Sequence, residues 1–229
     1  MTTVYLIRHA YAQGNLDRTF QGHIDGKLTG LGYRQLDCLA EYCRDLPFDA
    51  VYSSPLSRAM ETARAAARYH SLPVQAEAGL LEINGGSWEG RKWSELEAED
   101  PERYELWRQK DPSFCAPNGE RLGDVYTRMR DAILHIVEKN KDKTICIVSH
   151  GCAIAAFMAW ANGLPPEEIR QVKICDNTAV NKLVFDPAGR PRVVWQNETG
   201  HLNEELRTSA MALFQHQPPK GPEKEEKQG

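Results

Sequence analysis

The chain has 229 residues, of which 41% are hydrophobic and 26% are charged, and its formal net charge is −4 at pH 7. These proportions are typical of an ordinary globular protein, and the length fits one domain or one domain with a large insertion. Because the net charge is negative, no general basic field can attract nucleic acid or an anionic membrane, and we expect neither as a partner. Residues 218–229 combine proline, glycine and charge without a large apolar side chain, which predicts a disordered tail after a folded domain over 1–217.

The cysteines and the N-terminus indicate the compartment. The six cysteines form no C-x-x-C pair, and several lie in apolar runs such as 145–147, which is typical of buried free thiols in a reducing compartment. The N-terminus leads directly into an apolar run, without the basic region and cleavage site of a secretory signal. No window is apolar enough to span a bilayer. We therefore expect a cytoplasmic protein.

Four short segments predict the strands of a buried sheet. The apolar runs 4–7, 48–52 and 145–148 are typical of strands that are covered on both faces, as in a parallel sheet, and 73–76 could be a further strand. Strands of this kind alternate with helical patterns along the chain. The alternation predicts a doubly wound α/β sheet.

Two helices and a hairpin complete the pattern. Small apolar residues repeat at helical spacing over 56–66, and Ser53-Ser54-Pro55 before them predicts a helix start with a hydroxyl cap and proline in the first turn. A stronger amphipathic stripe over 122–137 predicts a helix that lies against the sheet. The segments 181–186 and 192–196 predict an antiparallel hairpin at one sheet edge.

A different pattern begins at about residue 85 and ends at about residue 119. Periodicity is weaker there and Trp88, Trp93 and Trp107 cluster, which predicts an inserted helical cap over the ligand end of the sheet. These aromatic side chains could stack on a nucleoside-like or sugar substrate. Because aromatic residues more often pack a small cap, we favour packing.

The residues that carry chemistry lie where the predicted strands end. Ligand sites of open α/β sheets lie beyond the carboxyl ends of the strands. Arg8 with His9, Arg58, and His150 all occupy such positions, so three strands deliver two arginines and two histidines to one place. Arginine matches the oxygens of phosphate, and helix N-termini add backbone N–H donors. The pattern predicts a phosphate site.

His9 is the candidate nucleophile of that site. A neutral imidazole can attack phosphorus, and neighbouring arginines would favour its neutral form and stabilise the transferred group. His150 would add a hydrogen bond there. Glu82 is the candidate proton donor to the leaving oxygen and then the base for water, with Glu89 and Glu120 as alternatives.

Taken singly, these residues could also have structural roles. A strand-end histidine is often a structural hydrogen-bonding residue, and Arg58 could form a surface ion pair with Glu61, three residues along a helix. Two histidines and a glutamate could also bind zinc. A metal cation beside Arg8 and Arg58 would meet like charge, so we expect neither a metal nor a cofactor.

Four groups of residues resemble, in order, the signatures of one enzyme family: 6–9 with Asn15, then 21–35, 53–63 and 148–151. That family is the histidine phosphatase superfamily, which contains cofactor-dependent phosphoglycerate mutases and many small phosphatases. The resemblance extends from about Val4 to Val184. It implies a three-layer α/β/α sandwich with a mostly parallel sheet and a small helical cap insertion.

The resemblance also assigns roles to residues. His9 would be phosphorylated, Glu82 would be the proton donor, and the phosphoryl group would be bound by Arg8, Arg58 and His150. The same comparison adds further residues of the phosphate or substrate site: Asn15, Gln21, Gly22 and Gly151.

Within the superfamily, 81–90 with Tyr104, Trp107 and 117–120 resemble the phosphatase branch, which includes α-ribazole phosphatases and broad-specificity enzymes. We therefore expect hydrolysis of a small phosphorylated metabolite through a phosphohistidine, with α-ribazole 5′-phosphate as a candidate substrate. Phosphoglycerate mutases usually have a longer cap, so a mutase-type phosphoryl transferase is the alternative. Residues 10–12 depart from the family pattern, which leaves open a catalytically weak phosphate-binding module. No pattern predicts an oligomeric state.

Overall fold

A single six-stranded sheet lies at the centre of the fold. The computed structural model describes residues 1–209, so the predicted tail over 218–229 lies outside the described residues. The strand order is β3-β2-β4-β1-β5-β6. The first four of these strands run parallel, and β5 and β6 are antiparallel to their neighbours. The strands are β1 Thr2–Arg8, β2 Ala50–Ser53, β3 Val74–Ala76, β4 Thr144–Ser149, β5 Val180–Phe185 and β6 Pro191–Glu198.

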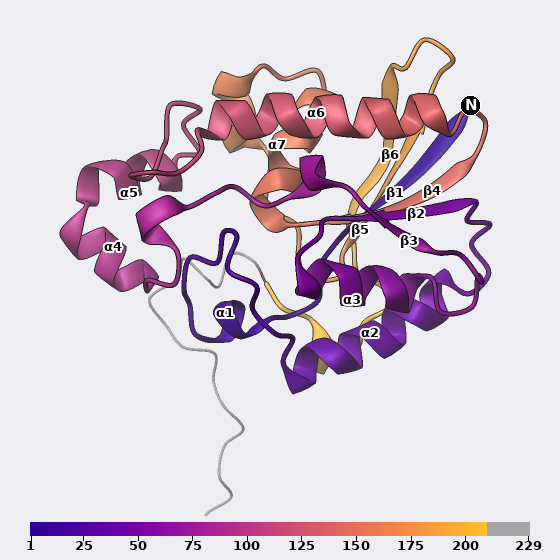
Figure 1. Cartoon of the computed structure of the whole chain (residues 1–229), viewed down its shortest axis with the longest axis horizontal. Helices are drawn as coiled ribbons and strands as arrows, with labels where there is room; N and C mark the ends of the chain where they lie inside the picture. Colours follow the sequence, from indigo (N-terminus) through magenta and orange to yellow (C-terminus); the bar gives the residue numbers. More distant parts are fainter. Residues whose placement is uncertain (210–229) are drawn as a thin grey trace, which may run out of the picture.

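Helices cover both faces of the sheet (Figure 1). Successive strand residues point to opposite faces. Val4 and Leu6 therefore pack in the core cluster that contains α6 and α7, whereas Tyr5 and Ile7 pack in the cluster that contains α2 and α3. The helices are α1 Gln13–Leu16, α2 Gly30–Cys43, α3 Ser57–Ala66, α4 Trp93–Glu99, α5 Pro101–Arg108, α6 Leu122–Lys139 and α7 Gly151–Ala161. The result is the predicted three-layer α/β/α sandwich.

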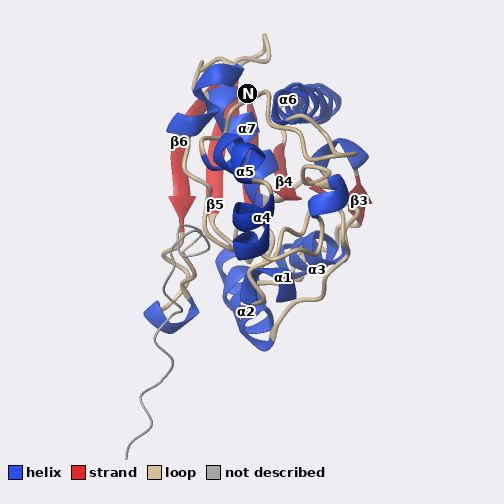
Figure 2. Cartoon of the chain, turned by 90° about the vertical axis from the view of Figure 1, so that its left-hand side faces the viewer, coloured by secondary structure: helices blue, strands red, loops and turns tan. Residues whose placement is uncertain are grey.

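The segment predicted as a cap contains the 3₁₀ helix η2 Gly86–Trp88 followed by α4 and α5. In Figure 1 these two α-helices lie at the end of the molecule opposite the N-terminus, and Figure 2 looks onto them. The ring of Phe20 lies 5.1 Å from that of Trp93 and 5.0 Å from that of Trp107, measured between centroids. Trp88 and Trp107 are buried. These side chains pack against one another in the cap, and Trp93 and Trp107 also line a pocket, so stacking on a substrate stays a prediction.

The start of α3 differs from the prediction. Its N-cap is Leu56, and no side chain of the N-cap position accepts a hydrogen bond there. The hydroxyl cap was wrong because the two serines are used elsewhere: Ser53 Oγ donates to the carbonyl of Ser54, and Ser54 Oγ bonds to His150. The carboxylate of Asp25 accepts from the N–H and the hydroxyl of Ser57 instead, at 2.6 Å each.

Three further expectations can be compared with the structure. β5 and β6 form the predicted hairpin, with β6 at the sheet edge. All six cysteines are free, but Cys38 and Cys115 are partly exposed rather than buried. Within residues 1–209, we find no helix with the length and apolar character needed to cross a membrane. The remaining 3₁₀ helices are η1 Ala78–Leu80, η3 Pro166–Gln171 and η4 Glu204–Leu206.

Candidate active site

The carboxyl ends of β1, β2 and β4 meet at one edge of the sheet. Parallel pairing places Arg8 opposite Ser149, and Ser53 opposite Val148. Past the strand ends, the N–H of His9 donates to the carbonyl of Ser149 at 3.0 Å. Parallel strands end at a common edge, so the two histidine segments, which are far apart in the sequence, become neighbours. The ring centroids of His9 and His150 lie 5.2 Å apart.

A hydrogen bond to the backbone fixes the tautomer of His9, the candidate nucleophile. Its Nδ1 lies 2.7 Å from the carbonyl oxygen of Ala10, which can only accept, so Nδ1 carries the proton and donates. In the neutral ring the lone pair is then on Nε2. Burial, Arg58 and Arg8 together lower the pKa of His9 well below its usual value, in that order of importance. The ring is therefore neutral at neutral pH, with Nε2 available for attack.

Two buried arginines adjoin this histidine. Arg8 Nη1 donates to the carbonyl of Cys175 at 2.6 Å. The two terminal nitrogens of Arg58 donate to the carbonyls of Ile24 and Gly22 at 2.6 and 2.7 Å. Arg58 is only 1% exposed, so its interpretation as part of a surface ion pair is wrong. Burial lowers its pKa to about 10, which leaves it cationic at neutral pH.

Both guanidinium groups keep unused donors. Within the described part of the chain, the buried Nε atoms of Arg8 and Arg58 have no hydrogen-bond partner, and neither has Nδ1 of His150. An unpaired buried donor costs free energy, and a bound oxyanion would offset that cost. Such donors beside the candidate nucleophile have the chemistry that binds the oxygens of an anion.

His150 lies next to His9, outside the pocket wall described below, and is fully buried. Its Nε2 is 2.7 Å from Ser54 Oγ, so a serine at the end of β2 fixes the ring that follows β4. Burial lowers its pKa well below the usual value, with smaller contributions from Arg58, His9 and Arg8. His150 is accordingly neutral, and one ring nitrogen can donate to a ligand only in the matching tautomer.

Glu82 approaches the same place from the loop after η1. Its Oε1 accepts from the N–H groups of Ile83 at 3.0 Å and Ala153 at 2.9 Å, and its Oε2 accepts from that of Cys152 at 3.1 Å. Two of these donors, Cys152 and Ala153, belong to the first turn of α7. The carboxyl group thus has a fixed position at the pocket wall.

A pocket joins these groups. It is lined by Arg8, His9, Asn15, Thr19, Phe20, Gln21, Gly22, Arg58, Glu82, Ile83, Trp93, Trp107, Cys152 and Ile174. Of the predicted site residues, His150 and Gly151 are absent from this wall. A Cβ on Gly151 would lie 3.2 Å from Arg8 Nε and 2.9 Å from a methyl group of Ile174. Gly151 therefore provides space for the guanidinium of Arg8.

Three further predicted residues lie on the wall. Asn15 is buried, and its Oδ1 accepts from the N–H of Ala12 at 3.0 Å. Gly22 has a positive φ of 49°, and a Cβ there would lie 2.1 Å from Glu89 Oε1. Because its carbonyl also anchors Arg58, Gly22 shapes the site through its backbone. Gln21 lies beside it on the wall.

Sequence reasoning missed the residues that hold the nucleophile's backbone. Asn177 Nδ2 donates to the carbonyl of His9 at 2.9 Å, and Thr62 Oγ1 accepts from the N–H of Ala10 at 3.0 Å. Thr62 stands in the motif around Arg58, which was a usable signal. Asn177 lies in an irregular segment without any periodic pattern, so no sequence feature singles it out.

The alternatives to Glu82 are occupied elsewhere. Glu89 Oε1 accepts from the N–H groups of His23 and Gly85, and both oxygens of Glu120 accept from Arg128. Neither glutamate lines the pocket. Tyr11 does not line it either, so this departure from the family pattern leaves the pocket open. Across residues 1–209, no group of three or more histidine, cysteine, aspartate or glutamate side chains could hold a metal ion.

Fold and site together define an α/β protein that places a neutral histidine and two buried arginines at the carboxyl edge of a mostly parallel sheet. Such an arrangement is suited to a phosphoryl group. The chain belongs to the histidine phosphatase superfamily (branch 1), whose family model matches residues 4–199.

Known proteins are similar over most of the chain. The "Bifunctional protein Rv2228c" of Mycobacterium tuberculosis is 32% identical over 88% of this chain, which spans only 55% of that protein's length. The adenosylcobalamin/alpha-ribazole phosphatase of Escherichia coli is 32% identical over 75% of this chain and 84% of its own. The solved structure of Bacillus stearothermophilus YhfR has a TM-score of 0.83, 29% identity, and coverage of 88% of this chain and 99% of its own. Other relatives are named phosphoserine phosphatase and probable phosphoglycerate mutase.

Proposed function

We propose that this chain hydrolyses phosphomonoesters of small metabolites through a phosphohistidine at His9. The supporting observation is the environment of that residue: its Nδ1 is tied to the carbonyl of Ala10, and the buried Arg8 and Arg58 adjoin it. The arginines supply the cationic charge that a metal ion supplies in other phosphatases. We therefore propose that the reaction needs no metal.

In the first step, Nε2 of His9 attacks phosphorus as the bond between phosphorus and the ester oxygen breaks. Arg8 and Arg58 neutralise the charge on the other phosphoryl oxygens. The departing oxygen takes a proton from Glu82, the carboxyl group on the pocket wall. The products of this step are the free alcohol and N-phosphorylated His9.

In the second step, Glu82 is a carboxylate and accepts a proton from water. The water oxygen attacks phosphorus, the bond to His9 Nε2 breaks, and inorganic phosphate leaves. His9 returns to its neutral form and Glu82 to its protonated form, so no net change remains on the enzyme.

The pocket wall supports a leaving group with an apolar, planar part. Phe20, Trp93 and Trp107 line it together with Ile83 and Ile174. Aromatic faces of this kind pack well against a flat heterocycle. With the similarity to an α-ribazole phosphatase, this favours α-ribazole 5′-phosphate as the first substrate to test.

The test is release of inorganic phosphate in the presence of a chelator. The panel contains α-ribazole 5′-phosphate, phosphoserine, nucleotides, sugar phosphates and 4-nitrophenyl phosphate, each with the wild type and His9→Ala. We expect chelator-resistant release that His9→Ala abolishes, and a labelled phosphoryl group bound to the wild type only. Equal release by His9→Ala would refute the mechanism, and release that the chelator abolishes would refute metal independence.

A mutase is the second candidate, since some relatives are named probable phosphoglycerate mutases. A mutase must keep its phosphohistidine away from water long enough to return the phosphoryl group. Incubation with 3-phosphoglycerate separates the two: a mutase forms the 2-phospho isomer, whereas a phosphatase forms glycerate and phosphate. A folded protein that binds phosphate but turns over no ester would indicate a binding module.

A further inference from the structure

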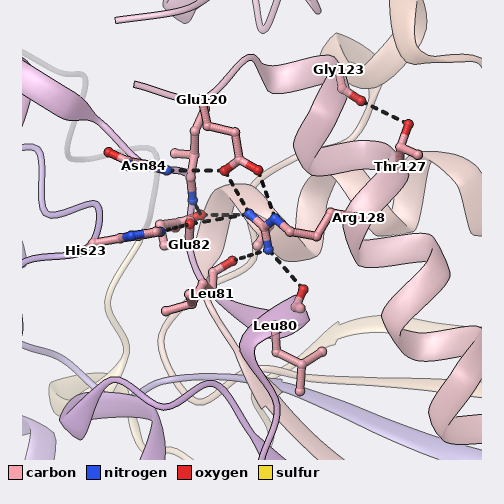
Figure 3. A network of polar contacts seen from close by, with 12 residues as sticks. His23, Leu80, Leu81, Glu82, Asn84, Glu120, Gly123, Thr127 and Arg128 are labelled. Carbon is pink, nitrogen blue, oxygen red and sulfur yellow. Dashed lines mark hydrogen bonds and ion pairs between the residues drawn. The ribbon is translucent and has the colours of Figure 1, made fainter. Parts of the chain in front are cut away.

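Arg128, in the middle of α6, is tied to the loop that carries Glu82 (Figure 3). Its Nη1 donates to the carbonyls of Gly79 at 2.9 Å and Leu81 at 3.0 Å. Its Nη2 makes a longer contact of 3.4 Å with the carbonyl of Glu82 itself. One side chain therefore holds three of the four consecutive backbone positions that lead to the proposed proton donor.

The other side of the same guanidinium is fixed by Glu120. Arg128 Nε donates to Glu120 Oε1 at 2.8 Å, and Nη2 donates to Glu120 Oε2 at 2.9 Å. With the three carbonyls, this pair occupies all five N–H donors of an arginine. The two side chains are 25% and 21% exposed, so solvent competes only weakly for these contacts.

Glu120 also reaches the loop beyond Glu82. Its N–H donates to the carbonyl of Asn84 at 2.9 Å, and its Oε2 lies 3.3 Å from the N–H of Asn84. His23 Nε2 donates to the carbonyl of Glu82 at 2.8 Å from the opposite side. The backbone around Glu82 is thus held by several side chains, and its carboxyl group, which lines the pocket, accepts from the N–H groups of Ile83, Cys152 and Ala153.

We propose that Arg128, with Glu120 as its partner, is a positioning residue that fixes the loop 79–84 so that Glu82 can protonate the leaving oxygen. Arg128 does not line the pocket and would act only through Glu82. This inference rests on the proposed function of Glu82. Proton transfer requires the acid within hydrogen-bond reach of the leaving oxygen, and a displacement of about 1 Å can cost on the order of a hundredfold in rate.

The measurement is kcat/KM for two substrates of similar shape, phenyl phosphate and 4-nitrophenyl phosphate. The value of kcat/KM covers the steps up to and including release of the leaving group, so it reports on the first chemical step. Phenolate is the more basic leaving group and needs the proton more, so loss of a correctly placed acid must slow phenyl phosphate more. We expect Arg128→Met to lower kcat/KM for phenyl phosphate about tenfold more than for 4-nitrophenyl phosphate. A loss of general stability would lower both values equally.

Controls connect the effect to Glu82. Arg130→Met, on the same helix but paired with Asp131, should change neither constant. Glu82→Gln should show the same discrimination between the two substrates, only larger. In the Glu82→Gln background, Arg128→Met should add no further discrimination, because residues that act through one group are not additive. Arg128→Lys, with three donors in place of five, should discriminate between the two substrates less than Arg128→Met does.

The outcomes are distinct. If Glu82→Gln discriminates between the substrates and Arg128→Met lowers both equally, the positioning role is refuted and the proposed function stands. If Glu82→Gln does not discriminate, the role of Glu82 as proton donor fails and this inference fails with it. If Arg128→Met does not fold, Glu120→Gln and Arg128→Lys allow the same comparison, and equal losses on both substrates would again refute the proposal.

Discussion

Three buried or partly buried histidines should make the fold sensitive to mild acid. Burial is the largest cause that lowers the pKa of His9 and of His150, and it lowers the pKa of His201 to about 4. In the unfolded chain each would titrate at about 6.5. Below that pH the unfolded state binds protons that the folded state does not, so the free energy of unfolding falls as the pH falls.

The magnitude follows from counting protons. Each histidine that is protonated only in the unfolded state contributes up to about 1.4 kcal/mol per pH unit, and the contributions of the three add. Above the unfolded pKa their contribution to stability is fully present. It is lost progressively as the pH falls below about 6.5.

His201 is the best probe because it lies outside the pocket wall, with its ring tilted against that of Tyr42 at 5.1 Å between centroids. Urea unfolding of His201→Gln, measured between about pH 5 and pH 7.5, should give the same slope as the wild type near pH 7.5 and a slope smaller by about 1 kcal/mol per pH unit near pH 5. His135→Gln, on the exposed side of α6, is the matched control. An unchanged slope for His201→Gln would show that this reasoning from burial is wrong.

Three predictions concern the pocket. His9 must be neutral to attack, and its pKa is lowered well below the usual value. The fall of kcat/KM on the acid side, corrected for ionisation of the ester, should therefore lie below about pH 6.5. A fall that begins above that pH would contradict this prediction. Gly22→Ala should lower kcat/KM at least about tenfold, since its Cβ would overlap Glu89 at positive φ, whereas Gly163→Ala, also at positive φ but in open space, should not. Trp107→Phe should raise KM about three- to tenfold for esters of aromatic alcohols and leave that for glycerol phosphate unchanged; equal changes would argue against aromatic contact.

The sequence was sufficient for the groups that meet at the sheet edge. Arg8, His9 and His150 follow apolar runs, and strands of one parallel sheet end at a common edge, so their meeting could be expected before the structure was known. Arg58, the second residue of α3, was expected at the same edge because it follows the run 48–52 closely. Residue types and their order along the chain were enough to predict this meeting, because the parallel topology brings the strand ends close together.

The supporting contacts could not be predicted in this way. Arg128 lies on a helix whose apolar stripe was recognised, but its acceptors are mainly backbone carbonyls, which every residue possesses. The acceptor of Asn177 is also a backbone carbonyl, that of His9, so no sequence pattern marks this contact. The cap of α3 failed as a prediction because Asp25, which is distant in the sequence, replaced the local serines.

The way the two site arginines are anchored connects folding with chemistry. Within the described residues, neither Arg8 nor Arg58 forms an ion pair; neutral carbonyls of Cys175, Gly22 and Ile24 hold them. A carboxylate partner would have cancelled their charge, whereas a carbonyl dipole fixes the guanidinium and leaves its positive charge to the pocket. Burial and that charge together lower the pKa of His9, and the charge would stabilise a transferred phosphoryl group. The same contacts therefore prepare both the nucleophile and the charge that its reaction requires.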